Sequence, residues 1–203
     1  MSLFITFEGA DGCGKTTQIE LLNKYLQEKG FKTLVTREPG AKGLGEKLRE
    51  ILLNYDGEVS PNCESFLFLA DRAQHVDCVI KPALKDGVIV LCDRHTDSTV
   101  AYQGYGRQLD IAQIKKLNEI AVNGLKPDLT IVFDIDIETS MQRVGKTKDR
   151  MESAGMDFFN RVRNGYLAIA KEEPNRVKVI NAADTIEGIH EKVVNDVNKS
   201  IGR

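Results

Sequence analysis

The sequence has no tryptophan, only five prolines and no excess of charge of either sign. Its 28 basic and 30 acidic residues leave a formal net charge of -2, so no bulk field attracts a polyanion such as nucleic acid. No apolar run reaches the roughly 20 residues of a membrane-spanning helix, and residues 1–7 lack the basic segment of a secretory signal. We therefore expect a cytoplasmic protein that has neither nucleic-acid nor membrane partners.

Cysteine is also sparse, and its four positions form no C-x-x-C pair. This spacing argues against a zinc site and against a disulfide framework. The chain also lacks an internal repeat, a low-complexity tract or a Pro- or Ser-rich linker. At 203 residues it is long enough for one well-buried core. We predict a single domain over residues 1–203.

Short apolar runs alternate with segments of helical period along the chain. Helices are expected at 15–29, 111–122 and 186–201, the last with an apolar stripe at spacings of three and four residues. The predicted strands are 3–7, 34–36, 88–92, 129–133 and 177–180. Such alternation predicts an α/β fold of three layers, with a five-stranded parallel sheet covered by helices on both faces.

Two segments depart from this regular pattern. Residues 62–84 form one long helical pattern with a polar and aromatic flank that includes Phe68, Arg72 and His75, so we expect a polar group against it. The same helix could offer an apolar flank to a second copy, although packing on the sheet gives the same pattern. Residues 143–156 are dense in charge and contain two glycines, which predicts a short mobile lid.

A phosphate-binding loop follows the first predicted strand. Residues 9–16, GADGCGKT, fit the pattern G-x-x-x-x-G-K-[ST] between a strand and a helix, as a P-loop requires. In such a loop the backbone N–H groups surround phosphate oxygens, Lys15 reaches the β- and γ-phosphates, and the Thr16 hydroxyl binds Mg²⁺. The predicted ATP-binding residues here are Gly9, Ala10, Asp11, Gly12, Cys13, Gly14, Lys15, Thr16 and Thr17.

Phosphate loops serve kinases, switch GTPases and motor ATPases alike. The sequence contains neither the N-K-x-D box of a guanine-specific switch nor an L-S-G-G-Q run. Arginines instead follow two predicted strands, at Arg37 and Arg94, and two more lie in the predicted lid, at Arg143 and Arg150. Because ligands of parallel sheets bind at the carboxyl ends of the strands, these cations predict a second anion beside the loop.

The residues resemble bacterial thymidylate kinases along essentially the whole chain. The matching segments are FEGADGCGKTT at 7–17, TREPG at 36–40, FLFLADRAQH at 66–75, DRHTDSTVAYQG at 93–104, DRMES at 149–153 and FFNRVRNGY at 158–166. The resemblance implies the P-loop NTPase fold, the conversion of ATP and dTMP to ADP and dTDP with Mg²⁺, and a homodimer.

The resemblance also implies roles for residues of the acceptor site. Arg37 and Arg94 would grip the dTMP phosphate, Phe68 would stack on the thymine and Arg72 would donate to its O4. Tyr102 would pack under the deoxyribose and leave no room for a 2'-hydroxyl. The full dTMP-binding set that it implies is Asp11, Arg37, Phe68, Arg72, Arg94, Ser98, Thr99, Tyr102 and Gln103.

On the donor side the resemblance implies that Arg143 covers the adenine and that Arg150 contacts the transferring phosphoryl group. Some family members place an arginine in the phosphate loop, but Gly12 stands there in this chain, so the lid must supply that cation. Lys146 and Lys148 are the alternatives. The implied catalytic residues are Lys15, Asp93, Arg94 and Arg150, and the metal-site residues are Thr16, Asp93 and Glu152.

Three questions remain open from the sequence. Asp134 also ends an apolar strand and is the alternative to Asp93 as the acid that orders Mg²⁺. The acceptor could be another nucleotide or deoxynucleoside, and the tolerance of dUMP is undefined. A P-loop module that uses ATP only to switch a partner interaction is the alternative from a different functional class.

Overall fold

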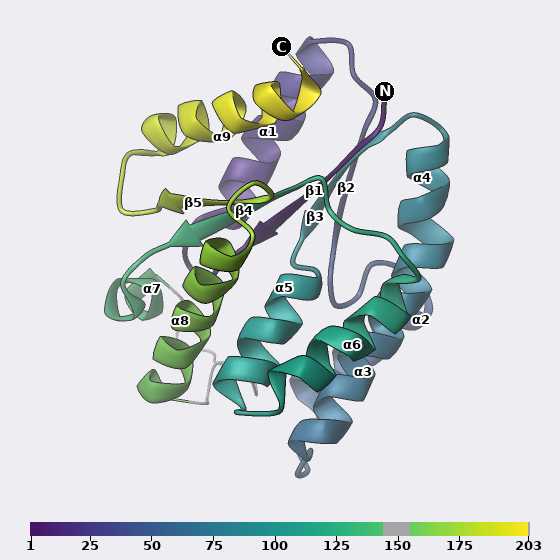
Figure 1. Cartoon of the computed structure of the whole chain (residues 1–203), viewed down its shortest axis with the longest axis vertical. Helices are drawn as coiled ribbons and strands as arrows, with labels where there is room; N and C mark the ends of the chain where they lie inside the picture. Colours follow the sequence, from purple (N-terminus) through teal and green to yellow (C-terminus); the bar gives the residue numbers. More distant parts are fainter. Residues whose placement is uncertain (144–154, 203) are drawn as a thin grey trace.

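The sheet predicted from the sequence is present, with all five strands parallel. The computed structural model describes residues 1–143 and 155–202 (Figure 1). The strand order is β2-β3-β1-β4-β5. The strands are β1 (Leu3–Glu8), β2 (Thr33–Arg37), β3 (Ile89–Asp93), β4 (Leu129–Asp134) and β5 (Val177–Asn181). The predicted three-layer α/β fold is confirmed, and no strand limit differs from its prediction by more than one residue.

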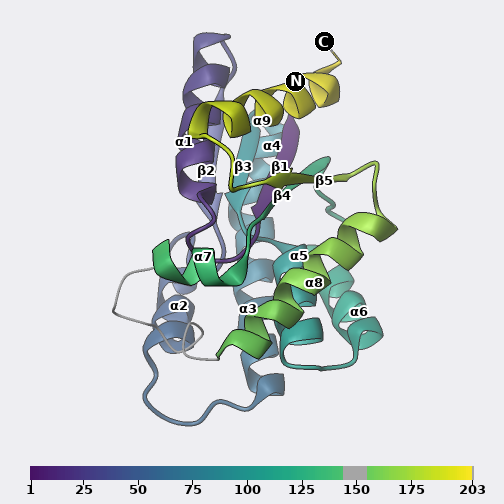
Figure 2. The same ribbon diagram turned by 90° about the vertical axis from the view of Figure 1, so that its left-hand side faces the viewer.

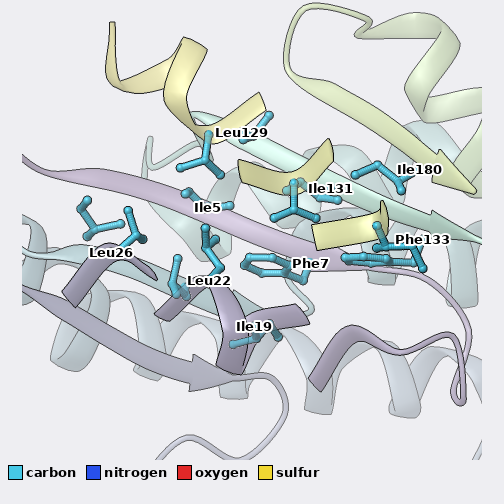
Figure 3. Packing of buried hydrophobic residues seen from close by; sticks show 14 of the residues in the cluster. Ile5, Phe7, Ile19, Leu22, Leu26, Leu129, Ile131, Phe133 and Ile180 are labelled. Carbon is cyan, nitrogen blue, oxygen red and sulfur yellow. The ribbon is translucent and has the colours of Figure 1, made fainter. Parts of the chain in front are cut away.

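One face of the sheet is covered by α1 (Lys15–Glu28) and α9 (Ile186–Ile201), which also pack on each other (Figures 1 and 2). Between these helices and the sheet lies the largest apolar cluster, in which Phe7 stacks on Phe133 at 6.3 Å between ring centroids. Leu22 and Leu26 of α1 are fully buried against it (Figure 3). Burial of so much apolar area fixes the position of the loop that connects β1 to α1.

The other helices lie on the opposite face and beside the carboxyl ends of the strands (Figure 2). They include α2 (Leu44–Asn54), α3 (Pro61–His75), α4 (Lys81–Lys85), α5 (Thr96–Thr99), α6 (Ile111–Val122), α7 (Ile137–Arg143) and α8 (Met156–Glu172). Two π-helical turns, Val76–Ile80 and Val100–Gly106, follow α3 and α5. The long helical pattern at 62–84 is thus confirmed, with a π-helical turn in its middle.

Four helices, α2, α5, α7 and α8, were not among the sequence predictions. The signal in α8 was available, because its buried positions Phe158, Val162, Tyr166, Ile169 and Ala170 recur at spacings of three and four. By contrast, α5 has only four residues and contains two β-branched threonines, so no periodicity could reveal it. Tertiary packing decides its conformation.

Only the two ends of the predicted lid, Arg143 and residues 155–156, are among the described residues. Arg143 is the last residue of α7, and α8 begins at Met156. Four residues assigned to the lid, Lys146, Lys148, Arg150 and Glu152, lie outside the described residues. Within the described ranges, no helix combines the length and the apolarity needed to cross a membrane.

The parallel topology gathers functional groups at one edge of the sheet. Glu8, Arg37, Asp93 and Asp134 are the last residues of β1, β2, β3 and β4. The register pairs Asp93 with both Phe7 and Arg37, so the ends of β2, β3 and β1 lie level with one another. The crevice beyond these ends is where parallel α/β folds bind ligands.

Candidate active site

The phosphate loop adopts a conformation that depends on its glycines. Gly9, Gly12 and Gly14 have φ values of 136°, 77° and 93°, which disfavour any other residue. A Cβ at Gly9 would also lie only 2.7 Å from the carbonyl oxygen of Phe133. Ser140 of α7 donates a hydrogen bond of 2.5 Å to the carbonyl oxygen of Asp11. The loop is therefore held in shape by β4 on one side and α7 on the other.

Lys15 begins α1 and its ammonium group turns back over the loop. Its Nζ donates to the carbonyl oxygens of Gly9 and Ala10, both at 3.1 Å, and the side chain is buried. Such a cation at the start of a helix adds to the positive end of the helix dipole. On the far side of the loop, Arg143 donates to the carbonyl oxygen of Ala182 at 3.5 Å, beyond the end of β5.

A pocket of about 270 Å³ lies next to the phosphate loop. It contains all nine residues of the predicted dTMP set together with Thr16 and Asp93, and four residues that the sequence did not suggest. These four are Glu38, Pro39, Arg49 and Leu53. Phe68 is only half-buried and borders the pocket. Asp11 belongs both to the loop and to the pocket, so the two sites are adjacent.

Arg94 dominates the end of the pocket nearest the phosphate loop. Its backbone has a φ of 68°, a conformation that costs energy for a residue with a Cβ and that concentrates at functional sites. Its guanidinium donates to Asp11 Oδ1 at 2.7 Å and lies 5.0 Å from the ring centroid of Tyr102. Burial favours a raised pKa for Asp11, but Arg94, Lys15 and Arg49 outweigh it and lower that pKa to about 2. Asp11 is thus ionised at neutral pH.

Behind Arg94 lies Glu8, a fully buried carboxylate that the sequence analysis missed. Ser98 Oγ donates to Glu8 Oε2 at 2.5 Å, and the Tyr166 hydroxyl donates to the same oxygen at 3.1 Å. The backbone N–H of His95 donates to Oε1 at 2.8 Å. Burial, helped by the nearby Asp97, raises the pKa of Glu8 to about 7 against the effects of these donors and of Arg94.

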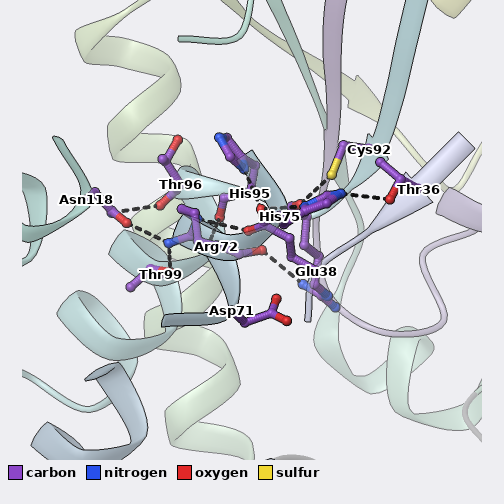
Figure 4. Close-up of polar contacts among 12 residues, drawn as sticks. Thr36, Glu38, Asp71, Arg72, His75, Cys92, His95, Thr96, Thr99 and Asn118 are labelled. Carbon is purple, nitrogen blue, oxygen red and sulfur yellow. Dashed lines mark hydrogen bonds and ion pairs between the residues drawn. The ribbon is translucent and has the colours of Figure 1, made fainter. Parts of the chain in front are cut away.

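The opposite end of the pocket is built around Arg72, whose side chain is almost completely buried (Figure 4). Its Nε donates to Glu38 Oε2 at 2.9 Å, and its Nη1 donates to Thr99 and Asn118 at 2.7 and 2.6 Å. Nη2 donates to the carbonyl oxygen of His95 at 2.8 Å. Four of its five N–H groups are therefore engaged, and the guanidinium orientation is fixed.

Glu38 is the centre of this network. Besides Arg72, it accepts hydrogen bonds of 2.9 Å from Nδ1 of both His75 and His95 at its Oε1 atom (Figure 4). Burial favours a raised pKa, but Arg72 and the two histidines outweigh it and hold the pKa of Glu38 well below its ordinary value. The polar flank predicted for residues 62–84 thus faces a buried carboxylate of the TREPG segment.

Two aspartates were candidates for the acid that organises Mg²⁺, and their surroundings differ. Asp134 receives two hydrogen bonds from Arg163, at 2.6 and 2.9 Å. Asp93 Oδ1 is buried and has no hydrogen-bond partner among the residues that the structure describes. Asp93 and Thr16 line the pocket together and also border an adjacent cavity of about 310 Å³. Their oxygen atoms are donors of the kind that Mg²⁺ prefers, so these two residues fit the ion.

Gln103, a member of the predicted dTMP set, donates from its amide to Glu64 Oε1 at 2.9 Å while it borders the pocket. Of the residues that the sequence analysis missed, Glu8 and Asn118 lie beneath the pocket surface, and Glu38 lines the pocket. An isolated carboxylate or amide in the sequence gives no sign of the buried partners that it has in the fold. Their partners become apparent only when β1, β2, α3 and α6 are brought together.

Comparison with known proteins agrees with this geometry. The family profile described as thymidylate kinase matches residues 7–193. The chain belongs to the thymidylate kinase family. The thymidylate kinase of Desulfovibrio desulfuricans is 47% identical over 197 residues, covering 92% of this chain and 91% of that protein. The one from Geotalea daltonii is 48% identical over 197 residues and covers 92% of each chain.

A solved structure extends the comparison to three dimensions. The crystal structure of thymidylate kinase from Ehrlichia chaffeensis matches with a TM-score of 0.80 at 37% identity, over 97% of this chain and 98% of that one. Thymidylate kinases are nucleotide-binding transferases that phosphorylate dTMP to dTDP with ATP. The predicted family, fold class and enzyme class are therefore confirmed for this chain.

Proposed function

We propose that ATP binds on the phosphate loop, that dTMP fills the adjacent pocket, and that the chain transfers the γ-phosphoryl group between them. The observation that supports this arrangement best is the 2.7 Å ion pair between Asp11 of the loop and Arg94 of the pocket. In this proposal the pair would join the donor site to the acceptor site, at the point where the two phosphates meet. Arg37 borders the same pocket and adds a second cation.

The chemistry that these residues supply is electrostatic. An acceptor phosphate is already ionised, so the reaction requires charge neutralisation and alignment more than a general base. Lys15 would hold the β- and γ-phosphates of ATP, while Arg94 and Arg37 hold the acceptor. Phe68 and Arg72 would contact the thymine, with Thr99 and Gln103 along the base, Tyr102 under the sugar and Ser98 beside Arg94.

Mg²⁺ is the proposed divalent cofactor. Thr16 and Asp93 would hold it with its waters, and Glu152 is the further candidate from the sequence. When bound, the ion neutralises charge on the β- and γ-phosphates of ATP.

Arg150 is the proposed lid cation, and Arg143 would cover the adenine. Arg150→Ala should lower turnover with little change in dTMP affinity, whereas a wild-type rate would transfer that role to Lys146 or Lys148.

We also propose that the chain works as one cytoplasmic domain, with a lid at 143–156, and as a homodimer that has no nucleic-acid partner. The dimer is supported by two exposed apolar side chains on neighbouring helices. Phe66 of α3 is 58% exposed and Ile120 of α6 is 69% exposed. Light scattering of the purified protein tests the stoichiometry, and a monomer at assay concentrations would contradict it.

The activity is tested by initial rates of ADP production with Mg-ATP and each of dTMP, dUMP, dCMP, AMP and thymidine. A reaction without acceptor gives the background hydrolysis. We expect strong stimulation by dTMP and loss of transfer in Lys15→Ala. Equal stimulation by AMP or dCMP would contradict the assignment of the acceptor, and no stimulation by any acceptor would contradict the kinase reaction.

A further inference from the structure

We propose that Glu8 is a positioning residue for the acceptor phosphate, which acts through Ser98 and Tyr166 on Arg94 and so contributes to the preference for dTMP over thymidine. The inference rests on the proposed binding of dTMP in the pocket. Glu8 is fully buried and is absent from the pocket lining, so it cannot contact the substrate itself. Its effect must be transmitted by the side chains between it and Arg94.

Two hydroxyl groups connect Glu8 to Arg94. Arg94 Nη1 lies 3.3 Å from both Ser98 Oγ and the Tyr166 hydroxyl. These two oxygens are themselves 2.8 Å apart. Since a guanidinium only donates hydrogen bonds, both hydroxyl oxygens must accept from Arg94. Their protons are then available for Glu8 Oε2, which lies within hydrogen-bond distance of both.

The arrangement requires acceptor character on both oxygens of Glu8. Oε1 faces the backbone N–H of His95, and Oε2 faces the two hydroxyl protons. A glutamine has one acceptor and one donor end, so whichever way its amide points, the NH₂ group meets a donor. If the NH₂ group faces Ser98 and Tyr166, their hydroxyl oxygens accept from it and their protons turn toward Arg94. Glu8→Gln therefore changes the support of Arg94 with almost no change of volume.

The chain has a second support for Arg94 on its other side. Nη2 donates to Asp11 Oδ1 at 2.7 Å, and the guanidinium lies over the ring of Tyr102. The Glu8 network contacts only Nη1. Loss of Glu8 should thus misalign the guanidinium without removing its charge. We expect a defect specific to ligands that have a phosphate.

Calorimetry with dTMP and with thymidine tests the proposal, because thymidine lacks the phosphate that Arg94 would hold. The titrations are made at about pH 8, above the pKa of about 7 for Glu8, so that the wild-type carboxylate is ionised. In Glu8→Gln we expect the Kd for dTMP to rise about tenfold, the equivalent of one charge-assisted hydrogen bond. The Kd for thymidine should stay within about twofold.

Two controls separate positioning from a general structural effect. Asp97→Asn removes another buried carboxylate, next to Ser98 in α5, which pairs with Arg176 and has no hydrogen bond to Arg94. It should leave the Kd of both ligands unchanged. In an Arg94→Ala background, Glu8→Gln should cause no further loss of dTMP affinity, because the residue through which it acts is already absent.

Equal weakening of dTMP and thymidine, or an unchanged Kd for dTMP, would overturn the inference. If Glu8→Gln does not fold, Tyr166→Phe removes one connecting hydroxyl and keeps the ring. It should weaken dTMP by about threefold and spare thymidine, whereas unchanged dTMP binding would overturn the inference in the same way. Failure of the proposed function gives a different result, namely a wild-type protein that binds neither ligand.

Discussion

A buried glutamate stands at each end of the proposed acceptor pocket, Glu38 in its lining and Glu8 behind Arg94, and the two carboxylates are supported by different chemistry. Glu38, at the base end, accepts from the guanidinium of Arg72 and from two imidazoles. Glu8, at the phosphate end, accepts from two hydroxyls and a backbone N–H. The pKa of Glu38 lies well below its ordinary value, whereas that of Glu8 is raised to about 7. Equal burial thus gives opposite shifts, and the partners decide the sign.

This difference matches what the proposed binding of dTMP would require of each end. At the proposed base end, Arg72 is paired with Glu38, so it would present a guanidinium of fixed geometry and largely neutralised charge to the uncharged ring. At the phosphate end, the Glu8 network orients Arg94 through hydroxyls and leaves the guanidinium close to Asp11 and the phosphate loop. The base end is organised for shape and the phosphate end for charge.

The largest expected effect is the loss of the base-end ion pair. Glu38→Ala leaves the guanidinium of Arg72, only 2% exposed, without its carboxylate. Breaking a buried pair in this way costs about 3–5 kcal/mol, which urea unfolding at about pH 7 would measure. The exposed Glu58 gives a matched control, since Glu58→Ala should change stability by no more than about 0.5 kcal/mol. A loss below about 1 kcal/mol in Glu38→Ala would contradict the central role of the pair.

The sequence predicted the residues that line the pocket better than the buried residues that hold them in place. The nine residues of the predicted dTMP set border one pocket, because each lies in a motif or at the end of a strand. Glu8 and Glu38 stand in the same motifs but were overlooked, since a lone carboxylate after an apolar strand gives no sign of burial. Asn118 is a polar residue in a helix whose partner is 46 positions away. Only the tertiary structure shows such a pair.

A smaller effect is expected on the pH dependence of folding stability, to which Glu8 and Glu38 contribute with opposite sign. The folded state binds the Glu8 proton more tightly than the unfolded state, where the pKa is near its ordinary value of 4.5. The stability from Glu8 is therefore largest below pH 4.5 and declines as pH rises to about 7. Glu38 has the opposite sign, because its lowered pKa gives stability that is lost as pH falls below 4.5.

Replacement of Glu8 removes its contribution to the pH dependence of folding stability. Between pH 4.5 and about pH 8, the stability of wild type minus that of Glu8→Gln should fall by up to about 3 kcal/mol. Asp97 and Arg94 face Glu8 and are present in both proteins, so their own contributions largely cancel. Urea unfolding at several pH values measures the difference. Identical pH profiles for the two proteins would show that Glu8 has an ordinary pKa.

The smallest expected effect concerns Asn118, which supports Arg72 from α6. Its Oδ1 accepts from Arg72 Nη1 at 2.6 Å and its Nδ2 donates to the carbonyl oxygen of Thr96 at 3.2 Å. Asn118→Ala leaves one N–H of a buried cation unpaired, which should cost about 1–2 kcal/mol of stability and weaken ligand binding about threefold. Because the defect lies at the base end, calorimetry should find dTMP and thymidine weakened by the same factor, unlike in Glu8→Gln. Gln113→Ala, at an exposed position of the same helix, should leave both affinities unchanged. If Asn118→Ala weakened the binding of dTMP alone, the two ends would not act separately, because a change at the base end would then have altered Arg94.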